Sequence, residues 1–338
     1  MKARALLNRH TFSPASARAL TSAATSPARG SNPDSQVKDR YTITDLRDWR
    51  TATADCEPPL KLAVIGDPVA HSASPPMHNA ALAALGIPAR YTRLHIRPDE
   101  LTEALGLLHK AGFIGINCTI PHKPAVLSAV DIADEGAKRA GGVNTVVVGA
   151  NGKLHGFSTD GPGFSRAVQE SFGIELKHLR VLVLGAGGGA GRAIAMQCAA
   201  EQCPALTLLN RSLDKLEPIL DDIAKIYPFD RVSSGDLSDL FLKIGLANSD
   251  LVVNCTALGM KPGDKSPAPA RHLEARHLLY DTIYVGHRTP LLTAGDSVGA
   301  RGANGLAMLL HQGALSFKIW FDREPYIEVM RAALGHRH

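Results

Sequence analysis

The chain has 338 residues, a length that suits about two domains and allows a hydrophobic core in each. Its composition, with 45% hydrophobic and 20% charged residues, is that of an ordinary globular protein. No stretch approaches the roughly 20 consecutive apolar residues of a membrane span, so we predict no membrane partner. The modest net charge of +5 suits a protein that handles small anions and gives little support for a nucleic-acid partner.

Five cysteines are scattered along the chain, and none forms a C-x-x-C pair. An odd and sparse count of this kind argues against a disulfide scaffold and favours a reducing compartment, which predicts a cytoplasmic location. Because structural zinc sites are built from closely spaced cysteine pairs, we expect no metal site.

The N-terminal segment differs from the rest of the chain. Residues 1–33 contain no acidic side chain and are rich in Ser, Ala and Arg, but they lack the hydrophobic segment of a secretory signal peptide. Two interpretations stay open for residues 1–40. One is a disordered extension, and the other is a transit peptide, which would direct the protein to an organelle. We expect ordered structure to start near Tyr41.

In the first half of the ordered chain, apolar strand-like runs alternate with helical patterns. Strands are predicted over 62–65, 89–96, 113–120 and 143–148. Ser74 is predicted to cap a helix that ends at Gly86, and a second helix is predicted over 99–112. The dipeptide Asn151-Gly152 indicates a turn. A series of βα units favours a mostly parallel sheet.

The second half contains a continuous apolar strand over 181–184, the loop GAGGGAGR, a helix and a further strand over 205–209. These segments occupy about 30 residues, the size of one βαβ unit. Two more strands are predicted over 250–256 and 277–284, and the segment after Gly305 has the apolar spacing of a helix.

The glycine loop is the first chemical signal. Gly185, Gly187 and Ala190 form the pattern G-x-G-x-x-A between a strand and a helix. Glycines let the backbone approach a pyrophosphate, and the next helix offers free N–H groups and the positive end of its dipole. The sequence therefore predicts dinucleotide binding by Gly185, Ala186, Gly187, Gly188, Gly189 and Ala190. The alternative is a tight turn that packs a helix against a sheet.

The end of the next strand predicts which dinucleotide is bound. An NAD site typically has a carboxylate here, which would repel a 2′-phosphate. This chain has Asn210, Arg211, Ser212 and then Lys215, and a guanidinium can hold a phosphate by two hydrogen bonds. The sequence thus favours NADP. The alternative is that Arg211 is a solvated loop residue.

Polar side chains follow or adjoin the apolar strands of the first half. They are Ser72 and Ser74, Asn117, Thr119 and Lys123, Asn144, and Asp160. Because ligands collect at the carboxyl ends of strands in α/β sheets, these groups are candidate ligand contacts. Hydroxyls, amides, one ammonium and one carboxylate suit a small polyhydroxylated acid. Taken singly, each would more often be a cap or turn residue.

Together, the segments HSASPPMHN, NCTIPHK, GGVNT, STDG, GAGG, NRS and NGLAMLLHQ occur in an order that resembles the shikimate dehydrogenase family. The resemblance covers roughly residues 61–321. It implies reversible NADPH-dependent reduction of 3-dehydroshikimate to shikimate, a step of chorismate and aromatic amino-acid biosynthesis. The expected partner is then this small-molecule substrate. We expect the protein to be a monomer or a homodimer.

The resemblance also implies an α/β fold in which an N-terminal α/β substrate domain precedes a Rossmann-like NADP domain, with C-terminal helices that return to the substrate domain. The expected boundaries are 41–160 together with 305–338 for the substrate domain and 161–304 for the NADP domain.

Site residues can be transferred by position. Lys123 and Asp160 match the catalytic pair of the family. The residues that match its substrate-binding positions are Ser72, Ser74, Asn117, Thr119, Asn144, Tyr284 and Gln312. Asn210, Arg211, Ser212 and Lys215 match the clamp on the adenosine phosphate, and Gly305 and Met308 match positions near the nicotinamide. Reducing a ketone by hydride builds negative charge on oxygen, so our hypothesis is that Lys123 supplies the proton.

Two positions depart from the family pattern. Ser158 stands where asparagine is usual, which loses an amide donor and puts the choice between shikimate and quinate in question. Lys215 stands where arginine is common. One alternative function is therefore a quinate/shikimate dehydrogenase with relaxed substrate or NAD use. Another is a non-enzymatic metabolite sensor on the same fold, against which the intact Lys123–Asp160 pair and glycine loop argue.

Overall fold

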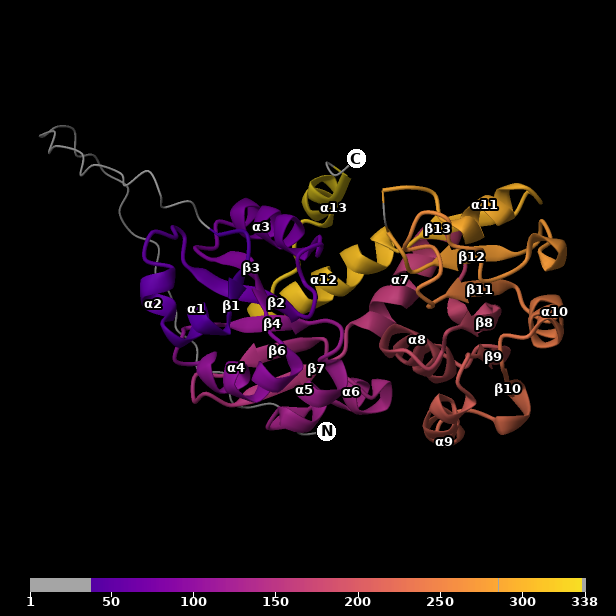
Figure 1. Ribbon diagram of the computed structural model, residues 1–338, viewed down its shortest axis with the longest axis horizontal. Helices are drawn as coiled ribbons and strands as arrows, with labels where there is room; N and C mark the ends of the chain where they lie inside the picture. The colour runs from indigo at the N-terminus through magenta and orange to yellow at the C-terminus, as the bar shows by residue number, and fades with distance from the viewer. Residues whose placement is uncertain (1–37, 285, 336–338) are drawn as a thin grey trace, which may run out of the picture. The chain divides into compact units, whose positions relative to one another are not determined.

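The computed structural model describes residues 38–284 and 286–335 (Figure 1). The expected extension over residues 1–40 lies outside the described residues, apart from its last three. The described chain forms two β-sheets, one of seven strands and one of six. Helices pack against both sheets, so the expected α/β class is confirmed.

The first sheet has the strand order β1-β3-β2-β4-β6-β7-β5. Its strands are β1 (Tyr41–Thr42), β2 (Leu60–Gly66), β3 (Arg90–His95), β4 (Gly115–Cys118), β5 (Ile132–Ala133), β6 (Thr145–Val148) and β7 (Leu154–Phe157). Most neighbouring strands are parallel, as expected. The pairs β4–β6 and β6–β7 are antiparallel. The expected turn at Asn151-Gly152 explains the second pair, because so short a connection can join only antiparallel strands.

The helices of this part are α1 (Ile43–Arg47), α2 (Trp49–Ala52), α3 (Ser74–Ala84), η1 (Pro98–Glu100), α4 (Leu101–Leu107), α5 (Lys123–Ala129) and α6 (Glu135–Ala140). The prediction that Ser74 caps α3 is wrong. The helix begins at Ser74 itself, because Ala73 before it already has helical backbone angles. The Ser74 N–H lies 3.3 Å from Ser72 Oγ, so Ser72 supplies the acceptor at this helix end.

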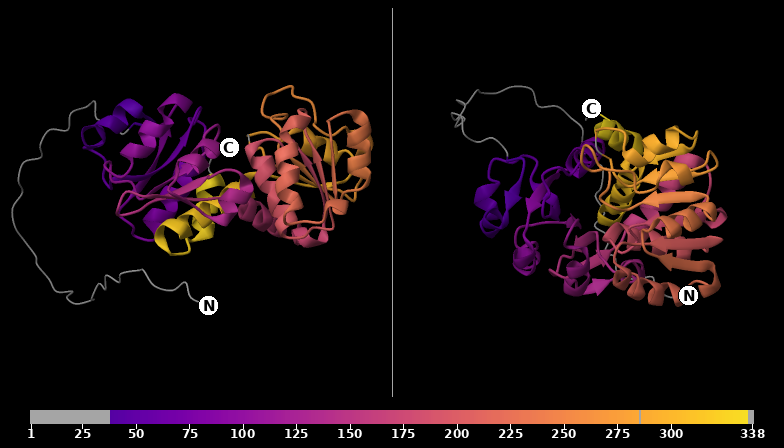
Figure 2. Two further views of the ribbon diagram at one scale, coloured as in Figure 1. Left: turned by 90° about the horizontal axis from the view of Figure 1, so that it is seen from below. Right: turned by 45° about the vertical axis from the view of Figure 1, so that its right-hand side comes forward.

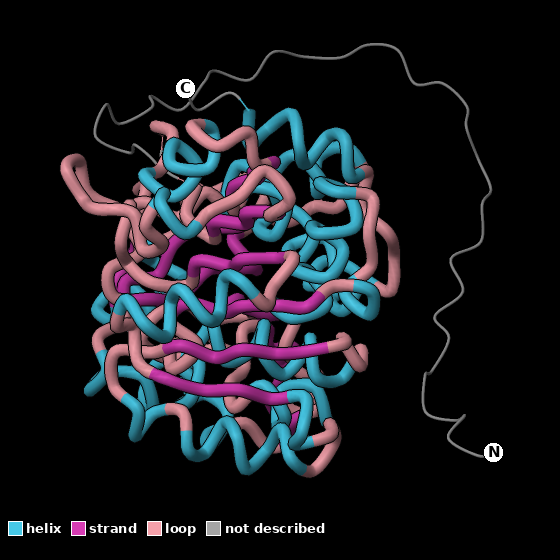
Figure 3. The backbone as a smooth tube through the Cα atoms, turned by 90° about the vertical axis from the view of Figure 1, so that its right-hand side faces the viewer, coloured by secondary structure: helices cyan, strands magenta, loops and turns pink. Residues whose placement is uncertain are grey.

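The second sheet has the order β10-β9-β8-β11-β12-β13, and all its pairings are parallel. Its strands are β8 (Arg180–Leu184), β9 (Ala205–Leu209), β10 (Val232–Gly235), β11 (Leu251–Asn254), β12 (Leu278–Asp281) and β13 (Arg301–Asn304). Renumbered from β8, this order is 3-2-1-4-5-6, the doubly wound arrangement of dinucleotide-binding sheets. In Figure 3 the molecule is turned so that this sheet faces the viewer.

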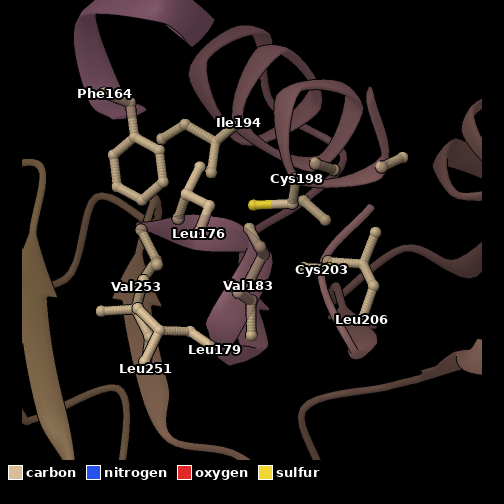
Figure 4. Packing of buried hydrophobic residues seen from close by; sticks show 14 of the residues in the cluster. Phe164, Leu176, Leu179, Val183, Ile194, Cys198, Cys203, Leu206, Leu251 and Val253 are labelled. Carbon is tan, nitrogen blue, oxygen red and sulfur yellow. The ribbon is translucent and has the colours of Figure 1, made fainter. Parts of the chain in front are cut away.

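The helices around the second sheet are α7 (Asp160–Phe172), η2 (Leu176–His178), α8 (Gly189–Ala200), η3 (Leu213–Lys215), α9 (Glu217–Ala224), η4 (Phe229–Arg231), α10 (Asp239–Ala247), η5 (Ala270–His272) and α11 (Pro290–Asp296). Alternate residues of β8 feed two clusters on opposite faces. Val181 and Val183 belong to one, which Figure 4 shows, and Leu182 and Leu184 to the other. Burial of both faces explains why this strand is continuously apolar.

The chain returns to the first sheet through α12 (Leu306–Phe321) and α13 (Ile327–Gly335). Near the end of α12, the indole N–H of Trp320 donates to the Val146 carbonyl in β6 at 2.9 Å. Helix α13 packs on α3, and α12 packs along α7. Figure 2 shows α12, in yellow, extending from the second sheet toward the first. The expected return of the C-terminal helices is confirmed.

Candidate active site

Lys123 and Asp160 form a close ion pair, although 37 residues separate them in the sequence. Lys123 is the first residue of α5, just after β4, and Asp160 is the first residue of α7. Lys123 Nζ lies 2.6 Å from Asp160 Oδ2, and the two side chains are 18% and 9% exposed. The carboxylate at the start of α7 is favoured by the helix dipole. The two residues that match the catalytic pair of the family are thus in direct contact.

Two amide side chains continue the hydrogen-bond network from Asp160 into the protein interior. Asn144 Nδ2 lies 3.0 Å from Asp160 Oδ1, 2.9 Å from Thr159 Oγ1 and 3.3 Å from Gln312 Oε1. Gln312 comes from α12, so two distant segments meet at Asn144. All four residues are at most 9% exposed. Because these hydrogen bonds are shielded from bulk water, they hold the carboxylate of Asp160 in one orientation.

A second buried group of polar side chains lies beside Asn144. Asn117 Nδ2 is 3.0 Å from Ser316 Oγ and 3.1 Å from Thr145 Oγ1, while Tyr91 Oη donates to Asn117 Oδ1 at 2.8 Å. Ser316 also lies 2.7 Å from Thr145 Oγ1. Sequence reasoning missed Tyr91 and Ser316. The one signal for Ser316 is that it follows Gln312 by one helical turn.

The remaining predicted substrate positions lie at the ends of β2 and β4. Arg93 in β3 donates to the Ser72 carbonyl from Nη2 at 2.8 Å, which fixes the backbone before Ser74. Thr119 follows β4, and its methyl carbon would lie 2.5 Å from a Cβ placed on Gly66 at the end of β2. Arg93 was not identified from sequence, because a charged residue inside a strand carries no motif.

The glycine loop turns tightly between β8 and α8. Gly185 has φ +82°, and a Cβ on Gly191 would lie 2.3 Å from the carbonyl oxygen of Gly185. The Gly187 N–H donates to Asn210 Oδ1 at 3.2 Å, and a Cβ on Gly187 would lie 2.7 Å from Asn210 Nδ2. Asn210, 8% exposed, therefore ties the loop to the end of β9. Gly187, Gly188 and Gly189 line the adjoining cavity without side chains, so the residues present fit a backbone-bound pyrophosphate.

Two cavities meet at this loop. One of about 490 Å³ is lined by Gly185, Gly187, Gly188, Asn210, Arg211, Ser212 and Lys215 and by residues that follow β11, Lys261 among them. The other, of about 290 Å³, is lined by Lys123, Asp160, Ser158, Gly187, Gly188, Gly189, Arg192 and Lys215. The loop thus separates a basic cavity from the Lys123–Asp160 pair.

Gly305, Met308 and Tyr284 lie along the end of β12 and the start of α12. A Cβ on Gly305 would lie 2.1 Å from the Thr282 carbonyl oxygen, so this close approach requires glycine. The Met308 N–H donates to Tyr280 Oη at 3.1 Å. Tyr284 lies beyond β12 and is 38% exposed. It lines a cavity of about 410 Å³ with His71, Ala73 and Leu306, separate from the cavity of Lys123.

Cys118 and Cys255 lie beside motifs of the sequence, but burial raises the pKa of both thiols. Protonated thiols are poor nucleophiles, which favours the interpretation of both as small apolar residues. Within residues 38–284 and 286–335, no group of three or more His, Cys, Asp or Glu side chains could hold a metal ion. Over the same residues, no helix has the length and apolar character needed to cross a membrane.

A doubly wound sheet with a glycine loop, joined to a second α/β unit that carries buried polar side chains, defines a Rossmann-like dinucleotide-binding oxidoreductase fold. A family model described as shikimate dehydrogenase substrate binding domain matches residues 64–146, and one described as shikimate 5'-dehydrogenase C-terminal domain matches residues 305–334. The NADP(+)-named shikimate dehydrogenase of Symbiobacterium thermophilum is 40% identical over 275 residues, which cover 80% of this chain and 92% of that protein. The chain belongs to the shikimate dehydrogenase family.

Solved structures agree with this assignment. The shikimate dehydrogenase of Thermus thermophilus in complex with NADP(H) and shikimate is 34% identical, with a TM-score of 0.73 over 82% of this chain and 99% of that one. Quinate dehydrogenase from Corynebacterium glutamicum in complex with NAD is 28% identical, with a TM-score of 0.73 over 82% and 99%. Proteins named for different acids thus share this fold, and the site residues must decide between them.

Proposed function

We propose that the protein is an NADP-dependent shikimate dehydrogenase that reversibly reduces 3-dehydroshikimate to shikimate. The observation that carries the proposal is the cavity in which the Lys123–Asp160 pair faces Gly187, Gly188 and Gly189. A dinucleotide seated on those glycines would end beside an ammonium group that can supply a proton. The named relatives support the same reaction.

In this mechanism, NADPH when bound supplies the hydride. Lys123 donates a proton to the oxygen of the ketone as negative charge builds there, and it takes the proton back when shikimate is oxidised. Asp160 Oδ2 holds the ammonium at 2.6 Å, and its second oxygen is fixed by Asn144. Asp160 therefore orients Lys123 and accepts a hydrogen bond from the substrate hydroxyl.

The substrate would be held by polar side chains from several parts of the chain, of which Asn144 and Gln312 are hydrogen-bonded beside this pair and Tyr284 lines a separate cavity. We propose contacts from Ser72, Ser74, Asn117, Thr119, Asn144, Tyr284 and Gln312. Ser72 and Ser74 suit the substrate carboxylate, since hydroxyls donate to it without adding charge. We place the substrate domain at 41–160 with 305–338 and the NADP domain at 161–304, because α7 and α12 each connect the two sheets.

The cofactor would be held on the other side of the glycine loop. The cavity lined by Arg211, Ser212 and Lys215 carries three positive side chains, with Lys261 as the third, against the single carboxylate of Asp264, and this excess of positive charge suits a 2′-phosphate. Asn210 contributes by shaping the loop through its bond to Gly187. Gly305 and Met308 at the start of α12 would lie near the nicotinamide.

A spectrophotometric assay of NADPH oxidation with 3-dehydroshikimate tests the proposal, and shikimate with NADP+ tests the reverse reaction. We expect turnover in both directions. Binding of shikimate without any nucleotide turnover would overturn the proposal in favour of a metabolite sensor.

One observation keeps quinate as a second candidate substrate. Ser158, which replaces the usual asparagine, lines the cavity of Lys123 and Asp160. A hydroxyl there leaves more space and one polar hydrogen fewer than an amide. Assays of shikimate and quinate with NADP+ and NAD+ separate the two functions. Ser158→Asn is the matched variant, and it should lower any quinate activity relative to shikimate activity.

We further propose a monomer or homodimer in the cytoplasm. All five cysteines are free thiols, which suits a reducing compartment. Light scattering of the purified protein measures the assembly. Sequencing of the mature N-terminus tests the organelle alternative, because removal of a transit peptide would shorten the chain.

A further inference from the structure

Arg192 makes two side-chain contacts that the proposed mechanism does not use. It lies in the first turn of α8, directly after the glycine loop. Its Nε donates to the carbonyl of Ala140, the last residue of α6, at 3.1 Å, and its Nη2 lies 2.6 Å from Asp222 Oδ2 in α9. The side chain is 21% exposed. The guanidinium therefore joins the glycine-loop helix to a helix of the first sheet.

The chain after α6 leaves room for this guanidinium. Gly141 has φ +66°, and a Cβ there would lie 2.2 Å from Arg192 Nε and 2.6 Å from its Cζ. Any other residue would both strain the backbone and displace the guanidinium. The contact thus depends on a glycine at this position.

The same short segment contacts Lys123 on its other side. A Cβ on Gly142 would lie 3.1 Å from Lys123 Cβ, and the Val143 N–H donates to the Lys123 carbonyl at 3.0 Å. Arg192 and Lys123 also line the same cavity of about 290 Å³. A chain of contacts therefore leads from α8 through Gly141 and Gly142 to the backbone and Cβ of Lys123.

We propose that Arg192 is a positioning residue, which sets the register between the glycine loop and the Lys123–Asp160 pair by holding the end of α6. The inference rests on the proposed function. The reacting atoms of a hydride transfer must approach to about 3–3.5 Å, and a misplacement of about 1 Å can cost roughly 100-fold in rate. The glycine loop would hold the hydride donor, and the Lys123–Asp160 pair would hold the hydride acceptor. The position of the loop relative to the pair therefore decides how closely donor and acceptor approach.

The test compares Arg192→Gln and Arg192→Lys with Asp222→Asn and with Arg180→Gln. Arg180, the first residue of β8, makes a two-point contact with Asp250 at 2.6 and 3.0 Å. Neither residue lines the cavity of Lys123 and Arg192. Arg180→Gln is therefore the matched control for loss of an arginine–aspartate contact. Each variant is measured for kcat, for KM with NADPH and shikimate, and for the NADPH dissociation constant by fluorescence.

We expect Arg192→Gln to lower kcat by about 10- to 100-fold while the NADPH dissociation constant changes by less than about threefold. Arg192→Lys should recover little, since an ammonium cannot reproduce the planar two-point contact. Asp222→Asn should lower kcat less, because the bond to Ala140 remains. Arg180→Gln should keep the wild-type kcat.

A second readout uses the protein without ligands. Hydrogen exchange of residues 141–143 should accelerate in Arg192→Gln and stay unchanged in Arg180→Gln, because the bond from Val143 to Lys123 loses its support. Unchanged exchange or unchanged kcat in Arg192→Gln would overturn the proposal. A weaker NADPH affinity at normal kcat would instead make Arg192 a direct cofactor ligand. An inactive wild-type protein with altered exchange in the variant would refute the proposed function and leave the tie to α6 intact.

Discussion

Gly163 in α7 lies directly against Gln312 in α12. A Cβ on Gly163 would stand 2.8 Å from the Gln312 backbone nitrogen and 2.9 Å from its Cα. This close approach lets the two helices that connect the sheets pack along each other. It also sets the position of the Gln312 amide opposite Asn144.

Gly163→Ala should therefore separate α7 from α12 at the candidate site. We expect a loss of about 1–3 kcal/mol in the free energy of unfolding, because backbone atoms must move to admit the methyl group. The KM for shikimate should rise as Gln312 shifts. Urea unfolding and steady-state kinetics measure the two effects.

Gly106→Ala in α4 is the control for this prediction. Among the described residues, no atom outside the backbone of its own helix and its chain neighbours lies within 4 Å of the Cβ position. Alanine there should be neutral or stabilising by up to about 1 kcal/mol, the difference in helix propensity. Equal effects of the two substitutions would contradict the importance of the Gly163–Gln312 contact.

Lys123→Ala should abolish most of the activity. A general acid contributes about 10²- to 10⁴-fold to a rate, so kcat should fall by that factor with a smaller change in KM. Lys138→Ala serves as the control, since Lys138 is 57% exposed and pairs with Glu135 on the surface of α6. Near-normal turnover of the Lys123 variant would remove this side chain from proton transfer.

Arg211→Ala and Lys215→Ala should weaken the use of NADPH while leaving the use of NADH almost unchanged. A charge-assisted hydrogen bond contributes about 1.5–3 kcal/mol, which corresponds to roughly 10- to 150-fold in KM. The comparison of kcat/KM for the two nucleotides measures the effect. Lys243→Ala, at an exposed residue of α10 outside the cavity lining, is the control. A parallel loss with both nucleotides would show that these side chains do not contact the 2′-phosphate.

His78 should make the stability of the protein depend on pH. Its ring stacks on Tyr91 with centroids 4.5 Å apart, and within the described chain neither ring nitrogen has a hydrogen-bond partner. Burial lowers the pKa of His78 to about 3. In the unfolded chain the pKa is about 6.5, so between these values the unfolded state binds the extra proton. Stability is therefore lost as the pH falls below about 6.5, by up to about 1.4 kcal/mol per pH unit.

His78→Phe keeps the stacked ring and removes the titrating group. Between about pH 7.5 and about pH 5, the free energy of unfolding of wild type should fall by roughly 2 kcal/mol more than that of the variant. His178→Phe, at an exposed histidine, should retain the wild-type pH dependence. Identical pH profiles for wild type and His78→Phe would exclude His78 as the source.

Local patterns in the sequence were enough to predict the central parts of both sheets. The apolar run 181–184, the glycine loop and the strand over 205–209 predicted β8, the turn before α8 and β9 within a residue or two. By contrast, β10 and β7 were not predicted. Val232–Gly235 and Leu154–Phe157 contain polar or small residues, and their pairing depends on strands already in place.

The same distinction between local pattern and tertiary packing applies to the candidate site. By itself, the sequence determined the α/β class, the glycine loop and the kinds of side chain near the strand ends, because spacing over a few residues encodes strands, turns and caps. The resemblance already implied that Lys123 and Asp160 act as a pair, whereas the tertiary structure alone decided that Gly163 meets Gln312 and that Arg192 reaches Ala140. These contacts join residues tens to more than a hundred positions apart. They depend on how whole helices pack, which no local pattern specifies.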